Sequence, residues 1–130
     1  MEQAINFLEI NEVLLNWAAN DPPIEDFTVE NVLYAIGLSE NYYQSVLKYL
    51  MTKDGYELIP KKMLLCPSNH KIQSFGLHED IEDELFDCYC GENDFSPENF
   101  LLVFEFTDFF KSQCQKKKKY WNPLKIPMLV

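Results

Sequence analysis

Three of the four cysteines and both histidines of this 130-residue chain lie in one stretch, CPSNHKIQSFGLHEDIEDELFDCYCGE, which runs from Cys66 to Glu92. Thiolate and imidazole groups are ligands that Zn²⁺ prefers in proteins. The chain shows no signal peptide, and no apolar run reaches the roughly 20 residues of a membrane helix. We therefore expect a cytoplasmic protein without membrane contact. Thiols stay reduced in that compartment, where clustered cysteines indicate a metal site more readily than disulfides.

The stretch contains two short motifs, each of which follows a predicted strand. Lys62–Leu65 leads into CPSNH, and Leu85–Asp87 leads into CYCGE. Two such knuckles, about twenty residues apart, resemble the zinc-ribbon family, in which each knuckle is usually a Cys-x-x-Cys followed by glycine. The resemblance implies a structural zinc ion as cofactor, bound by Cys66, His70, Cys88 and Cys90.

Both motifs depart from the zinc-ribbon pattern. Asn69 stands where a second cysteine is expected, and His70 follows one position later. In the second motif Cys88 lies one residue too close to Cys90, and Asp87 occupies the usual position. Two interpretations therefore stay open. One is a zinc site with irregular spacing, and the other is a metal-free relic whose cysteines pack as small apolar groups.

No motif in the chain predicts an enzyme. Four protein ligands would leave a zinc ion no open position for catalysis. The four glycines are too far apart for a phosphate-binding loop, and no Gly-x-Ser-x-Gly sequence occurs. Consecutive acids such as those between Glu79 and Glu84 are typical of a solvated surface. His78 and Cys114 fall outside the two knuckles. We expect a protein that is not an enzyme.

The apolar pattern upstream of the cysteines predicts three helices. Ile5–Ala19 forms the first, with an apolar stripe at helical spacing made by Phe7, Ile10, Leu14 and Trp17. The second begins after Thr28 and stops at Gly37, and the third begins after Ser39. Threonine and serine are favoured N-caps, and glycine can take the left-handed conformation that ends a helix.

Short strands are predicted after the helices. Tyr56–Ile59 and Lys62–Leu65 are two of them, separated by Pro60–Lys61, and Asn99–Phe110 is a third, with alternating side chains. The remaining tail combines four lysines, Lys116–Lys119, with an apolar end that we expect to pack back onto the domain.

The join between the second and third helices, LYAIGLSENYYQSVLKYL, resembles the winged version of the helix-turn-helix family. The resemblance covers roughly residues 5–65 and implies that the strands after Asp54–Gly55 form the wing. We therefore expect an α+β protein. Its parts are a three-helix winged-helix-like unit at 1–60, a small antiparallel zinc-ribbon-like β unit at 61–110, and a basic and apolar C-terminal segment at 111–130. Such combinations resemble small accessory proteins of bacteria and phages.

The charge favours a protein partner over nucleic acid. The net charge is −10 and the chain contains no arginine, the residue that supplies much of the phosphate and guanine contact in DNA-binding proteins. We expect an acidic protein-binding module, an adaptor, inhibitor or immunity-type factor, that docks on a basic partner surface. The predicted contact residues are Glu79, Asp80, Glu82, Asp83 and Glu84, together with the acids between Glu25 and Glu40.

Two alternatives stay open. A winged-helix transcriptional regulator would place Asn41, Gln44 and Lys48 of the third helix in the major groove. Few lysines lie near that helix to neutralise phosphates, so nucleic acid is the less favoured partner. The second alternative is that the acidic surface mimics DNA and binds a DNA-binding protein.

Overall fold

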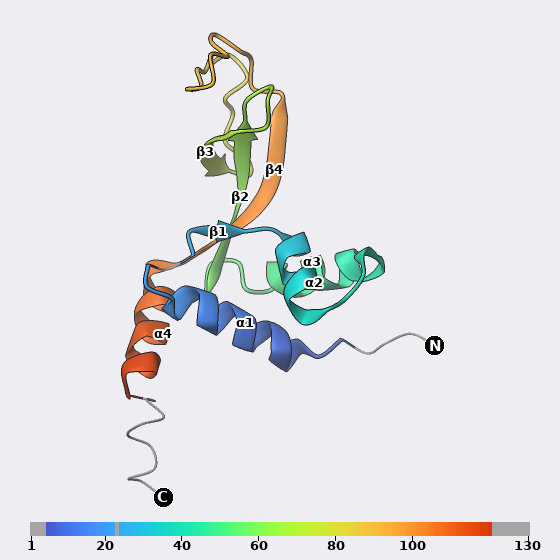
Figure 1. The fold of residues 1–130 in the computed structure, drawn as a ribbon, viewed down its shortest axis with the longest axis vertical. Helices are drawn as coiled ribbons and strands as arrows, with labels where there is room; N and C mark the ends of the chain where they lie inside the picture. Colours follow the sequence, from blue (N-terminus) through green and yellow to red (C-terminus); the bar gives the residue numbers. More distant parts are fainter. Residues whose placement is uncertain (1–4, 23, 121–130) are drawn as a thin grey trace, which may run out of the picture.

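The computed structural model describes residues 5–22 and 24–120, and it confirms the α+β class. Figure 1 shows the helices gathered towards one end and the strands rising from them as a projection. We call residues 62–102, which form this projection, the arm. Within the described ranges, no helix is long and apolar enough to cross a membrane.

Helix α1 (Phe7–Ala19) begins at an N-cap that the sequence signals did not identify. The side-chain oxygen of Asn6 accepts hydrogen bonds from the backbone N–H groups of Leu8 (3.0 Å) and Glu9 (3.4 Å). Ile10 and Leu14 are buried, as the predicted stripe requires. Phe7, at the start of that stripe, is 43% exposed and stacks on Tyr49 at 4.4 Å between ring centroids.

Helix α2 (Val29–Ile36) has the predicted boundaries and a reciprocal cap. The Thr28 hydroxyl accepts a hydrogen bond from the Asn31 N–H (3.1 Å), and the Asn31 side chain accepts one from the Thr28 N–H (2.9 Å). Two N–H groups that no helical carbonyl can reach are thereby paired. The helix ends at Gly37, whose φ of 72° lies in the left-handed region that glycine adopts at little cost.

Replacing Thr28 with alanine should lower the free energy of unfolding by about 1 kcal/mol, because the first turn of α2 loses its side-chain acceptor. Urea unfolding followed by circular dichroism would measure the loss. Ser39→Ala is the matched control, since the Ser39 side chain makes no capping hydrogen bond. Equal losses in the two variants would contradict a specific role for the Thr28 cap.

The third helix starts differently from the prediction. A 3-10 turn, η1 (Glu40–Tyr42), follows Ser39, and α3 runs from Tyr43 to Met51. The prediction that Ser39 caps this helix through its side chain is wrong, because the tight turn uses a backbone bond from Tyr42 N–H to the Ser39 carbonyl (3.1 Å).

A four-stranded antiparallel sheet has the order β1-β4-β2-β3. Its strands are β1 (Asp26–Phe27), β2 (Leu58–Leu65), β3 (Lys71–Gly76) and β4 (Asn99–Phe106). The prediction of two strands separated by Pro60–Lys61 is wrong, because β2 continues through Pro60. A proline interrupts a strand only where its missing N–H is needed, and β3 pairs with β2 only from Lys61 onwards. Strands β1 and β3 were not predicted.

Helix α4 (Asp108–Tyr120) replaces the end of the predicted strand Asn99–Phe110 and the start of the predicted tail. Thr107 begins it, with its hydroxyl accepting a hydrogen bond from the Phe110 N–H (3.1 Å) and its carbonyl accepting one from the Lys111 N–H (3.0 Å). Phe109 and Phe110 follow Thr107, and phenylalanine favours strands. The sequence pattern therefore predicted a strand where α4 begins. The apolar end that we expected to pack back, 123–130, lies outside the described residues.

The main core joins all four helices to the base of the sheet. Buried side chains from α1, α2 and α3 pack against Leu58 of β2, Phe104 and Phe106 of β4, and Cys114 of α4. A second, much smaller cluster lies in the arm and has only Leu64, Phe75 and Ile81 as buried members. The arm is therefore anchored firmly at its base and weakly along its length.

Candidate metal centre

The four residues that the zinc-ribbon resemblance implies as ligands meet in the arm. Cys66 and His70 lie in the turn between β2 and β3, and Cys88 and Cys90 lie in the long connection from β3 to β4. Their ligand atoms all lie within 4.8 Å of one another. The site lies at the end of β2 that points away from the helices (Figure 1).

The distances fit a single ion. The Sγ atom of Cys66 lies 3.3 Å from Nδ1 of His70 and 3.7 Å from Sγ of Cys90, and Sγ of Cys88 lies 3.8 Å from Nδ1 of His70. In a tetrahedral site with Zn–S near 2.3 Å and Zn–N near 2.1 Å, two sulfur atoms lie about 3.8 Å apart and sulfur and nitrogen about 3.6 Å apart. These three distances are close to the tetrahedral values, and since all four ligand atoms lie within 4.8 Å of one another, small side-chain movements would let them bind one metal ion.

The first knuckle compensates for its irregular spacing through its backbone. Asn69 has a φ of 69°, a left-handed conformation that asparagine tolerates, and its N–H donates to the Cys66 carbonyl at 2.8 Å. This turn brings the N–H groups of Ser68 and His70 to 3.3 Å from the Cys66 sulfur. It also places the imidazole of His70, rather than residue 69, beside that sulfur.

The second knuckle is held by bonds on both sides of its cysteines. The Cys88 N–H donates to the Glu92 carbonyl (2.7 Å), and Gly91, with a φ of 102°, makes the reversal between them. Asp87 does not take the place of a cysteine in the ligand cluster. Its carboxylate accepts a hydrogen bond from the Asp94 N–H (2.8 Å) and so closes the loop that carries both thiols.

The two thiols with perturbed acidity differ in direction. Burial raises the pKa of Cys66, but the N–H groups of His70 and Ser68 that donate to its sulfur outweigh this effect, and the pKa falls to about 7. The Glu92 N–H lowers the pKa of Cys90, but desolvation and the neighbouring Cys88 and Cys66 raise it above its ordinary value overall. Of these two thiols, Cys66 is thus the one more readily present as the thiolate that a metal requires.

Five of the acidic residues predicted to contact a partner lie on the loop between β3 and the second knuckle, and all five are exposed: Glu79, Asp80, Glu82, Asp83 and Glu84. Buried Ile81 anchors this loop to the small core of the arm. Within the described part of the chain, none of the five carboxylates forms an ion pair. Their charge is therefore available to another molecule.

Residues of the alternative DNA interface are also exposed. Asn41 lies in η1, and Gln44 and Lys48 lie on α3, at a spacing that places them near one another on the helix surface. His78 is exposed and Cys114 is buried in the main core, and neither belongs to the four-ligand cluster. Asn99, which no sequence motif indicates, donates a side-chain hydrogen bond to Asn69 at 2.7 Å and so ties the first knuckle to β4.

Comparisons of the chain with protein-family models, with curated proteins and with solved structures find no match.

Proposed function

We propose that the chain is a non-enzymatic protein-binding module, whose acidic arm is held in shape by a structural zinc ion and docks on a basic surface of a partner protein. One observation carries the proposal. Four convergent ligands, Cys66, His70, Cys88 and Cys90, lie on either side of an exposed acidic loop and would fix both of its ends.

Zinc is the metal that best suits this ligand set. Three thiolates and one imidazole form a soft donor set, which favours zinc over magnesium or calcium. Four ligand atoms from two separate turns lie within 4.8 Å of one another, which supports a bound metal ion over a metal-free relic. Since four protein ligands complete a tetrahedral shell, the ion would stabilise the fold and would not activate water.

The charge of the arm selects the partner. Nine acids occur from Glu79 to Glu98, whereas no lysine occurs between Lys71 and Lys111. A zinc ion bound by three thiolates and a neutral imidazole adds one further negative charge. Complementary potentials accelerate association and exclude partners of like charge, so a basic protein surface is the expected match.

The helical end supports a revised winged-helix assignment. The order α1, β1, α2, α3, β2, β4, with β1 hydrogen-bonded to β4, fits a winged helix whose wing strands are β2 and β4. Residues 66–98 would then be an insertion in the wing that carries the metal ligands. The same fold serves protein docking as well as DNA binding, and the acidic arm favours docking.

Charge reversal in the arm tests the docking proposal. Changing Glu82, Asp83 and Glu84 to lysine should weaken binding of a lysine-rich model peptide about tenfold, at roughly 0.5 kcal/mol for each exposed ion pair lost. The fold should survive, because no hydrogen bond or ion pair of these three side chains occurs among the described residues. Fluorescence titration at low salt would measure the affinity.

The matched control changes Glu12, Asp21 and Asp54, three exposed acids of the helical end, to lysine. The net charge shifts by the same amount, so a general electrostatic effect would weaken both variants equally. A loss confined to the arm variant supports the arm as the docking surface. Equal losses would contradict it.

A further inference from the structure

A groove of about 540 Å³ lies between the start of β2 and the first turns of α4. Its lining includes three aromatic side chains, Tyr56 from the segment before β2 and Phe109 and Phe110 from α4. Tyr56 is 75% exposed and Phe109 is 71% exposed. Large aromatic side chains left open on both walls of a hollow mark a surface that another apolar group covers.

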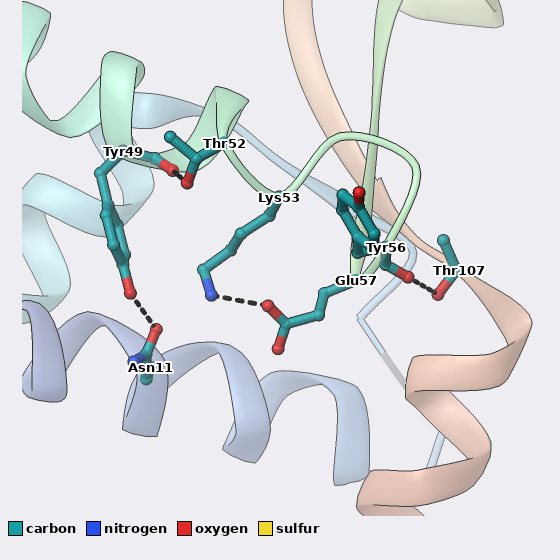
Figure 2. Close-up of polar contacts among 7 residues, drawn as sticks. All are labelled: Asn11, Tyr49, Thr52, Lys53, Tyr56, Glu57 and Thr107. Carbon is teal, nitrogen blue, oxygen red and sulfur yellow. Dashed lines mark hydrogen bonds and ion pairs between the residues drawn. The ribbon is translucent and has the colours of Figure 1, made fainter.

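The walls of the groove are fixed to each other. The Thr107 hydroxyl donates to the Tyr56 carbonyl at 2.9 Å, as Figure 2 shows, and the Thr107 N–H donates to the Glu57 carbonyl at 3.0 Å. The Glu57 carboxylate in turn forms an ion pair with Lys53, with 2.6 Å between Oε1 and Nζ (Figure 2). The far side of α4 is held as well, because the Gln115 amide donates to the Asn20 carbonyl at 3.1 Å. The groove is therefore preformed and needs no rearrangement to accept a ligand.

We propose that residues 121–130 of the same chain, WNPLKIPMLV, dock in this groove as an extended segment. Their sequence alternates in the way that such a segment requires. Leu124, Ile126, Met128 and Val130 occupy every second position, and an extended backbone places alternate side chains on one side. Pro123, Lys125, Pro127 and Leu129 fall on the opposite side, so the single charged side chain of the segment is not on the docking side.

The two prolines favour the same conformation. Each fixes its own φ near −65° and disfavours the helical region for the residue before it, which is Asn122 or Ile126. An extended segment that is already restricted loses less conformational entropy when it binds. Proline at every fourth position therefore argues against continuation of α4 and for an extended strip.

The segment is long enough to reach. Phe109 stands eleven residues before Tyr120, the last residue of α4, a distance of roughly 17 Å at about 1.5 Å per helical residue. Ten extended residues span roughly 33 Å. A chain that reverses after Tyr120 can thus run back along α4 to the groove and still place several side chains in it.

Methyl NMR of the full chain labelled at its methionines tests the proposal directly. We expect nuclear Overhauser contacts between the Met128 methyl group and the ring protons of Phe109 or Tyr56. Phe109→Ala should remove these contacts. Tyr34→Ala is the matched control, because Tyr34 is also highly exposed (90%) but does not line the groove, and it should leave the contacts unchanged.

The register of the segment gives a second test that does not alter the groove. Ile126→Ser removes a side chain from the docking side and should raise amide exchange rates at 107–114 about tenfold. Leu129→Ser removes an equally large side chain from the opposite side and should leave them unchanged. The proposal is overturned if Met128 shows no contact with the groove, or if its contacts appear only between differently labelled copies of the chain.

Discussion

Purified protein should contain one zinc ion per chain, and a strong chelator should unfold the connection from β3 to β4 (77–98) while the helical core and the paired strands β2 and β3 stay folded. The reason lies in the unequal sizes of the two cores. The main core joins α1, α2, α3 and α4 to the base of the sheet, whereas the separate cluster in the arm has only Leu64, Phe75 and Ile81 as buried members. So small a cluster cannot order the connection from 77 to 98 by itself.

A structural zinc ion would supply the missing stabilisation. Binding to a tetrahedral site of thiolates and imidazole is worth about 10 kcal/mol or more, and this energy becomes folding energy where the free site is not held in place. Elemental analysis gives the stoichiometry. Hydrogen exchange before and after chelation should show protection lost at 77–98 and retained in the four helices, with most of the helical circular dichroism signal unchanged.

Two cysteine variants separate metal loss from a packing defect. Cys90 is exposed, so Cys90→Ser removes little packing, yet it should abolish stoichiometric zinc and reproduce the effect of the chelator. Cys114 is buried in the main core, so Cys114→Ser should lower the melting temperature and keep the zinc ion. Protein that is folded, free of metal and unchanged by chelator would show that the cluster is a relic.

The ligand set could be predicted from sequence, but the way in which it closes could not. Residue types and approximate spacing pointed to Cys66, His70, Cys88 and Cys90, and the ligand atoms do converge. The irregular spacing is accommodated by backbone conformation, in the left-handed turn at Asn69 and the reversal at Gly91. No side-chain pattern records these conformations, because asparagine and glycine permit them without requiring them.

The elements most easily misread were those set by long-range pairing. Local signals located α2 and the turn at Gly37 well, since a cap and a left-handed glycine are properties of a few adjacent residues. Strand β3 reads as polar and was missed, because its existence depends on its partner β2. Pro60 looked like an interruption, but β2 runs through it beside β4 and beyond the end of β3.

Zinc affinity should fall as the pH is lowered, and it should fall more steeply below about pH 7. The metal binds thiolates, so every ligand that is still a thiol must release a proton on binding. The pKa of Cys66 is lowered to about 7, so above that pH this ligand is already ionised and releases none. The pKa of Cys90 is raised, so Cys90 still gives up a proton there, and this costs affinity about tenfold per pH unit.

Below pH 7 Cys66 also binds a proton, which adds a further factor of about ten per pH unit. The same lowered pKa stabilises the metal-free fold fully above the ordinary thiol pKa of about 8.5, and this contribution disappears as the pH falls through 7. Competition with a chromophoric chelator from pH 6 to pH 9 would measure the slope. Thiolate absorbance of the metal-free protein should show one thiol ionising near pH 7, and Cys66→Ser should remove that step. If the step persists in Cys66→Ser, the backbone N–H groups of Ser68 and His70 do not control the chemistry of the centre.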